Sequence, residues 1–140
     1  MAETAPQLDR VMKIVRTAAR QLVGADGVTF IVRDGEQCAY IEEDAVGKLW
    51  KGQRFPLGPC VSGWVMQHGT PAIIPDIYTD ERVPIETYRT TFVKSMAMVP
   101  VGSPAVAAIG AYWATPHEAT QSQVETLAAI ADSAFIQTAD

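Results

Sequence analysis

Cysteine and histidine are scarce in this sequence, which contains two residues of each among 140. A disulfide scaffold needs several cysteine pairs, so Cys38 and Cys60 are too few to build one. A metal centre needs ligands at short spacing, and neither His68 nor His117 has a Cys or His neighbour at such a spacing. We therefore expect no metal site. Three states of the cysteines stay open: reduced thiols of a cytosolic protein, one disulfide, or a reactive thiol.

Long apolar runs and clusters of basic residues are also missing. No apolar run reaches the ~20 residues that a membrane-spanning helix needs, and the polar segment MAETAPQLDR at the start does not resemble a signal peptide. The eleven Lys and Arg residues are scattered, and the net charge is -5. A surface that binds nucleic acid needs clustered positive charge. These absences predict a cytoplasmic protein that binds neither membranes nor nucleic acid.

Apolar residues are plentiful, and at each end of the chain they follow a helical period. They make up 48% of the residues against 19% charged ones, which predicts one domain over residues 1–140 with one core. The first helix would begin at Thr4 or Pro6 and end at Gly24. In the second, Thr120 and Gln123 form a potential capping box. The stripes consist of Leu8, Val11, Met12, Val15, Ala18, Ala19 and Leu22 in the first helix, and of Val124, Leu127, Ala128, Ala131, Ala134 and Phe135 in the second.

Between these helices the apolar period shortens to two, which is typical of strands. The Asp-Gly pair at residues 34–35 predicts a tight hairpin, and Gly110 would let another element approach its strand closely. The order predicts an α+β fold with one antiparallel sheet and both terminal helices on one face. In chain order we expect strands at 28–33 and 38–43, a loop with one short strand at 44–58, a short helix at 58–69, a strand at 71–75, a helical turn after Pro84, and strands at 92–102 and 105–114.

Four segments in this order resemble a GAF domain, over about residues 5–138. They are GADGVTFIVRDG, CVSGWVMQHGTPAIIPDI, FVKSMAMVPVG and AIGAYWATPHEATQSQVETLAAIA. The resemblance is closest to GAF domains of bacterial sensor histidine kinases. It implies a GAF/PAS-like six-stranded antiparallel sheet, with the N- and C-terminal helices packed on one face and pocket-forming loops and short helices on the other.

The resemblance also implies a ligand pocket beneath residues 44–92, where aromatic residues gather. Asp76 would either meet a polar ligand atom or cap its own turn through a backbone N–H. Arg82 and Arg89 would either bind a phosphate or lie in a solvated loop. The aromatic rings would line an apolar pocket or simply fill the space. The candidate ligand-binding residues are Trp50, Phe55, Cys60, Trp64, Asp76, Tyr78, Arg82, Tyr88, Phe92 and Tyr112.

A non-enzymatic sensory or regulatory module is the function that the resemblance implies, and no Ser–His–Asp array is readable that would favour an enzyme. Such a module would bind a small molecule and form a homodimer through its terminal helices. It would act on a kinase or another effector domain of a signal-transduction protein. The sequence names neither the ligand nor a cofactor.

Three other chemistries known in the family remain as alternatives. Bilin-binding relatives commonly attach the chromophore to a Cys in the region matched here by YTDERVPIETYRTTF, which has none. The subfamily that reduces free methionine sulfoxide uses two cysteines. This chain has Ser62 near the position of the first and no Cys near the position of the second. Cys38 and Cys60 would then have to form a different redox pair. Relatives that bind cyclic nucleotides usually have an Asn-Lys-x-x-Phe-x-x-x-Asp-Glu signature, which is absent.

Overall fold

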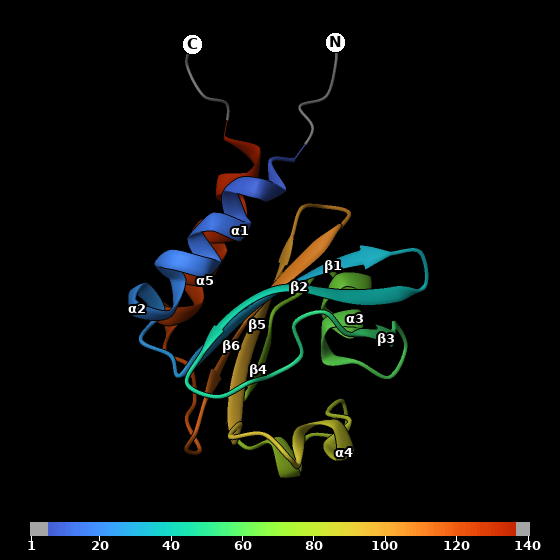
Figure 1. Cartoon of the computed structure of the whole chain (residues 1–140), viewed down its shortest axis with the longest axis vertical. Helices are drawn as coiled ribbons and strands as arrows, with labels where there is room; N and C mark the ends of the chain where they lie inside the picture. Colours follow the sequence, from blue (N-terminus) through green and yellow to red (C-terminus); the bar gives the residue numbers. More distant parts are fainter. Residues whose placement is uncertain (1–5, 137–140) are drawn as a thin grey trace.

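The computed structural model describes residues 6–136, and its elements follow the predicted order (Figure 1). Every predicted strand and helix is present, with shifted boundaries. Thr4, one of the two proposed helix starts, lies outside the described residues. The elements are α1 (Leu8–Thr17), α2 (Ala19–Val23), β1 (Gly27–Asp34), β2 (Gln37–Ala45), β3 (Arg54–Pro56), α3 (Val61–His68), β4 (Ala72–Ile74), η1 (Ile77–Thr79), α4 (Ile85–Tyr88), β5 (Ser95–Val101), β6 (Ala107–Trp113), α5 (Gln121–Asp132) and η2 (Ser133–Phe135).

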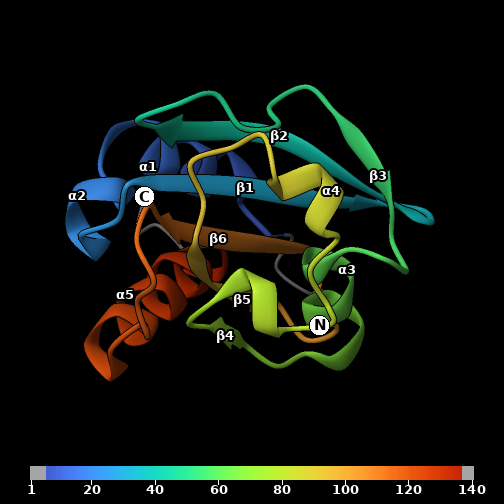
Figure 2. The same cartoon turned by 90° about the horizontal axis from the view of Figure 1, so that it is seen from below.

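The strands form one six-stranded antiparallel sheet in the order β3-β2-β1-β6-β5-β4. Gly35 lies in the β1–β2 turn with φ of 62°, a left-handed conformation that glycine adopts without strain. The pairing of β1 with β2 skips Ile41 between Phe30 and Ile31, which marks a bulge in β2. Figures 1 and 2 show α1, α2 and α5 on one face of the sheet, and α3 and α4 on the other side. The predicted layer arrangement is therefore confirmed.

The helical face of the sheet is covered by aliphatic side chains. Alternate residues of β1 and β6 point toward the helices, among them Val28, Phe30 and Ile109. Val11 of α1 and Leu127 of α5 pack on them and are fully buried. Small residues such as Ala107 and Ala111 let the helices lie close to the strands. The apolar stripes of both terminal helices are therefore used within this chain.

The terminal helices differ in one detail from the prediction. The predicted single helix at 4–23 is interrupted at Ala18, whose φ of -141° leaves the helical region, so that α1 and α2 are separate. Gly24 ends α2 in a left-handed conformation, as expected. The capping box of Thr120 and Gln123 is also present at the start of α5.

Tyr112 accounts for the glycine at position 110. The two residues lie on the same face of β6, and a Cβ at Gly110 would come within 2.5 Å of the Tyr112 hydroxyl oxygen. The Met98 methyl group of the neighbouring strand β5 would lie 2.9 Å from the same Cβ, so Gly110 makes room both for the ring of its own strand and, as predicted, for another element. The Tyr112 hydroxyl lies 2.8 Å from the Thr29 hydroxyl, so both buried groups are satisfied.

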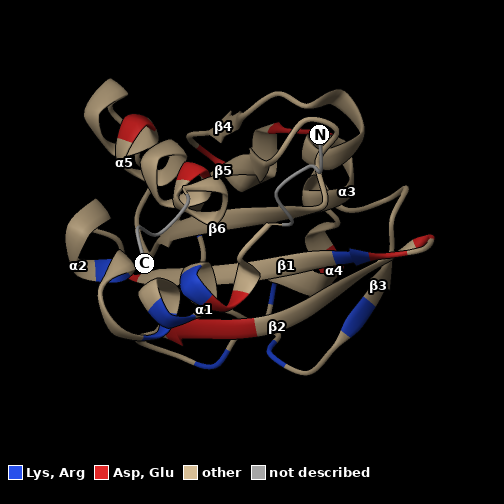
Figure 3. Cartoon of the chain, turned by 90° about the horizontal axis from the view of Figure 1, so that it is seen from above, with Lys and Arg blue, Asp and Glu red and all other residues tan. Residues whose placement is uncertain are grey.

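Charged residues tie α1 and α2 to the edge of the sheet at β2. Glu42, whose side chain is 6% exposed, lies 3.2 Å from an Arg16 nitrogen and 2.8 Å from the Lys51 ammonium. Arg20 and Asp44 form a second pair at 3.3 Å. Figure 3 shows the basic positions of α1 beside the acidic end of β2. The hydrogen bond from Lys51 is the main cause that lowers the pKa of Glu42 below its ordinary value. The Glu43 N–H and Arg16 lower it further, and burial opposes them.

No helix within residues 6–136 is long and apolar enough to cross a bilayer.

Candidate functional site

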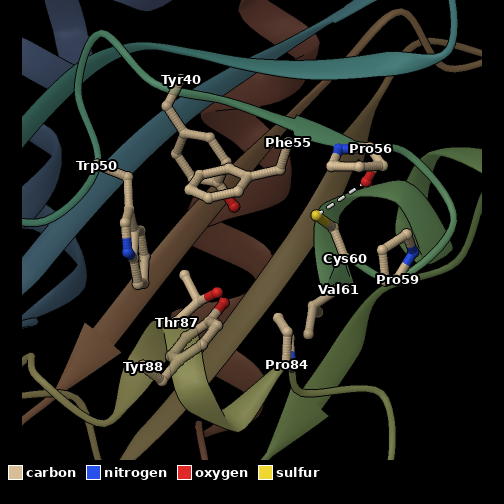
Figure 4. Close-up of a pocket in the computed structure, with 10 residues that line it drawn as sticks. All are labelled: Tyr40, Trp50, Phe55, Pro56, Pro59, Cys60, Val61, Pro84, Thr87 and Tyr88. Carbon is tan, nitrogen blue, oxygen red and sulfur yellow. Dashed lines mark hydrogen bonds between the residues drawn. The ribbon is translucent and has the colours of Figure 1, made fainter.

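A cavity of about 150 Å³ lies on the face of the sheet opposite the terminal helices. It is formed where β2, β3, the start of α3 and α4 converge, and its lining is almost entirely apolar (Figure 4). The lining residues are Tyr40, Trp50, Phe55, Pro56, Pro59, Cys60, Val61, Pro84, Thr87 and Tyr88.

Glu43 holds the loop that places Trp50 at the cavity. Its carboxylate accepts hydrogen bonds from the backbone N–H groups of Leu49 at 3.0 Å, Trp50 at 2.8 Å and Lys51 at 2.9 Å. Backbone donors to a carboxylate form charge-assisted bonds, which are stronger than neutral ones. A loop without regular structure is thereby fixed against β2. Glu43 was not among the predicted site residues, because a carboxylate in a strand usually indicates a position exposed to solvent.

Gly63 allows α3 to approach the chain that leads into it. A Cβ at this position would lie 1.7 Å from the Leu57 carbonyl oxygen, which is far inside van der Waals contact. Because residue 63 has no side chain, the first turn of α3 packs directly on the backbone after β3. This close approach brings Cys60 and Val61 to the cavity wall.

The aromatic rings of the wall are inclined to one another. Tyr40 lies 5.5 Å from both Trp50 and Phe55 between ring centroids, at 66° and 90°. Trp50 is 4.7 Å from Tyr88 at 59°. Edge-to-face pairs of this kind are mutually stabilising. Rigid rings that meet at such angles form a cage and do not stack flat, and the space between them is the cavity.

Two cysteines lie together beside the cavity. Cys38 on β2 and Cys60 before α3 are both buried and free. The Cys60 thiol donates to the Pro56 carbonyl oxygen at 3.1 Å, and both cysteines belong to the same buried cluster. The neighbouring Cys60 side chain, opposed by burial and helped by Ser62, lowers the pKa of Cys38 to about 7. The proximity of Cys38 and burial raise the pKa of Cys60.

Four of the ten predicted ligand-binding residues line the cavity: Trp50, Phe55, Cys60 and Tyr88. Tyr112 lies behind Trp50, with ring centroids 5.6 Å apart, and does not reach the wall. Phe92 instead packs near Gly27 and Gly47.

The other four predicted residues lie on the outer side of this layer. Asp76 accepts a hydrogen bond from the Tyr78 N–H at 2.9 Å and so caps η1, the second of its two interpretations. Tyr78 itself is 56% exposed. The Arg82 guanidinium pairs with Asp80 at 2.7 Å and lies 4.4 Å above the Trp64 ring. The Asp80 partner raises the pKa of Arg82, and the pair is complete without a ligand.

Six lining residues were not selected from the sequence: Tyr40, Pro56, Pro59, Val61, Pro84 and Thr87. Tyr40 could have been found, because it lies two residues after Cys38 and therefore on the same face of β2, the one that the terminal helices do not cover. The prolines and Thr87 carried no recognisable pattern. Their place depends on how three separate segments meet in space.

Within residues 6–136, no group of three or more His, Cys, Asp or Glu side chains is placed to hold a metal ion.

The fold has many solved counterparts. The GAF domain of Acinetobacter phosphoenolpyruvate-protein phosphotransferase is 14% identical, with 91% of this chain and 89% of that chain covered and a TM-score of 0.69. The free methionine-R-sulfoxide reductase from Neisseria meningitidis, solved with its substrate, is 18% identical over 91% and 78%, with a TM-score of 0.72. The blue-light absorbing form of the PixJ GAF domain from Thermosynechococcus elongatus is 16% identical over 91% and 83%, with a TM-score of 0.73.

These identities are low enough that the structures support the fold alone. Among curated proteins no match is found. The family model described as GAF domain matches residues 5–136, which is nearly the whole chain. The chain therefore belongs to the GAF domain family.

Proposed function

We propose that this GAF domain is a non-enzymatic, cytoplasmic sensory module that binds a small molecule in the cavity between β2, β3, α3 and α4. The observation that carries the proposal is the cavity itself. It is caged by rigid rings, apolar, and separated by the sheet from the terminal helices. Apolar pockets with a few polar groups are the usual form of small-molecule sites.

The output would pass through the ends of the chain to an effector domain, such as the kinase of a two-component system. The Arg10 guanidinium donates to the carbonyl oxygens of Ser133 and Ile136, each at 2.8 Å. The Gln7 N–H also donates to the Ala134 carbonyl oxygen at 2.6 Å. The start of α1 and the end of η2 are thus tied together, so that a shift of one moves the other.

A homodimer through the terminal helices belongs to the same proposal. Because the main apolar stripes are buried against the sheet, the contact would use the residues still exposed there. Leu22, Phe135 and Ile136 are 60%, 38% and 58% exposed. Light scattering should show a dimer that the Leu22→Lys variant weakens, and a strict monomer at high concentration would count against this route.

Native mass spectrometry of the domain purified from cells tests the ligand. We expect a small molecule that adds to the mass of the chain and is released on denaturation. A Thr87→Phe variant, which fills the cavity, should be isolated without it. The sensory proposal would be overturned if the domain showed no added mass and if no fraction of a cell extract raised its melting temperature.

A cysteine-based redox role is the second candidate, and the contact between Cys38 and Cys60 favours it. The Cys38 thiolate would attack a peroxide to give a sulfenic acid and water. The Cys60 thiol would then displace a second water and close an S–S bond. Peroxide should therefore remove two hydrogens from the wild type but not from Cys38→Ser. A Cys60→Ala variant should raise the pKa of Cys38 from about 7 toward ~8.5. Two unreactive thiols would exclude this role.

A bilin chromophore has no such support. A cavity of about 150 Å³ has room for one ring system, whereas a bilin contains four pyrrole rings.

A further inference from the structure

We propose that the cavity selects a small neutral molecule built on one aromatic ring, such as a phenol or a benzyl alcohol. This deepens the proposed function and depends on it, since it names the chemical class of the ligand. The observations are the size of the cavity, the absence of charge from its lining, and the kind of surface that its walls present.

The size limits the ligand to one ring. The cavity measures about 150 Å³, and a dry apolar cavity of ~150 Å³ is known to bind benzene. The mutual angles of the rings of Tyr40, Phe55 and Trp50 are fixed by edge-to-face contacts. The walls therefore have little freedom to move apart for a nucleotide or a tetrapyrrole without loss of those contacts.

The lining excludes charged ligands. None of the ten lining residues is Asp, Glu, Lys, Arg or His. Burial raises the pKa of the Tyr40 and Tyr88 hydroxyls and contributes to the raised pKa of Cys60, so all three stay neutral at physiological pH. A buried charge without a partner loses its hydration and gains nothing in return. The two arginines that a phosphate ligand would require are paired elsewhere, Arg82 with Asp80 and Arg89 with Glu86.

The walls match a ring with one polar substituent. Tyr40, Trp50, Phe55 and Tyr88 present aromatic surface, and the prolines present C–H groups to a ring face (Figure 4). Polar capacity is confined to a few hydroxyls. The Tyr88 hydroxyl donates to the Met96 sulfur at 3.8 Å, which is a weak acceptor, so a better acceptor on a ligand could replace it. Thr87 is half-buried at the wall.

Three probes that share one ring and differ in charge test the proposal: benzyl alcohol, benzoate and benzylammonium. Dissociation constants would be measured by ligand-observed NMR titration of the whole chain well below the pKa of about 7 of Cys38, so that no thiolate lies beside the wall. We expect benzyl alcohol to bind at least ~10-fold more tightly than either ion, because only the ions lose hydration without gaining a partner.

Variants locate the binding. Thr87→Phe should weaken benzyl alcohol ~10-fold or more by filling the cavity, while Thr90→Phe, an exposed neighbour outside the lining, should leave binding unchanged. Val61→Ile adds only one methylene and serves if Thr87→Phe does not fold. It should weaken binding several-fold.

The outcomes separate the ligand class from the sensory role. If benzoate or benzylammonium binds as tightly as the alcohol and Thr87→Phe weakens it, the cavity is a ligand site but the class is wrong. If no probe binds, or if all variants bind the alcohol equally, the class is also overturned. The native mass measurement above then decides by itself whether the cavity holds another molecule.

Discussion

The two faces of the sheet are built from the same strands and differ in what covers them. The helical face is packed with Val, Ala, Ile and Leu under long helices. The opposite face carries Tyr, Trp, Cys and Met side chains under short elements and loops. Aliphatic side chains interdigitate to near-crystalline density, whereas large rigid rings under short segments leave space. The first face therefore forms a closely packed core, and the second supplies the site.

The largest expected effect is on the helical face. Leu127→Ala removes a fully buried side chain at the centre of α5 and should lower the free energy of unfolding by ~3 kcal/mol, because the cavity it leaves cannot fully collapse. Val46→Ala is the control, since this residue is 57% exposed, and it should change stability by less than ~0.5 kcal/mol. Urea denaturation measures both. Equal effects would mean that α5 does not anchor the core.

Gly63→Ala should come next, with a loss of ~2 kcal/mol from overpacking. Its new methyl group would collide with the Leu57 carbonyl oxygen and push α3 away from the cavity wall. Gly58→Ala is matched to it, because nothing lies within 4 Å of a Cβ at Gly58. A stable Gly63→Ala variant with an intact ligand site would show that the close approach of α3 is not required.

Glu43→Ala should cost ~1.5 kcal/mol, since three backbone donors lose a charged acceptor and water can replace it only in part. The emission of Trp50 should also shift to longer wavelength as the loop loosens. Glu118→Ala replaces an exposed carboxylate and serves as the control. If both variants are equally stable, the loop is held by its aromatic contacts alone.

The smallest expected effect is the pH dependence at Glu42. Its folded-state pKa is lowered, so its contribution to stability is complete above the ordinary value of ~4.3 and is lost as the pH falls through the folded value. The size is only ~0.5–1 kcal/mol, because Arg16 and Lys51 are each more than half exposed and screened by solvent. Wild type should exceed Glu42→Gln by this amount at pH 7, and the difference should vanish near pH 2. A constant difference would contradict the ion pairs.

Much of the fold could be predicted from local patterns. The Asp-Gly turn, the capping box of Thr120 and Gln123, and the stop at Gly24 were each readable because they depend on neighbouring residues. The break at Ala18 was not readable, since alanine is the best helix former and the apolar stripe continues across it. The reason for Gly110 was found only in part, because the approach of Met98 from β5 was expected in kind but the position of the Tyr112 ring along its own strand was not.

The site divides in the same way. Trp50, Phe55, Cys60 and Tyr88 were selected from the sequence and do meet at one cavity. Trp64 and Arg82 were selected as well, yet the Arg82 guanidinium lies over the Trp64 ring on the outer side, away from the cavity. Residue type alone cannot tell an aromatic ring that faces a cavity from one that faces a cation.

By itself the sequence determined the order of the elements, the single antiparallel sheet and the family, because apolar period, turns and caps are properties of short stretches. Only the tertiary structure decided that Cys38 lies beside Cys60, that Glu43 holds Trp50, and that the cavity has room for one ring. Those facts depend on the meeting of segments far apart in the chain, and their positions follow from the packing of the whole core.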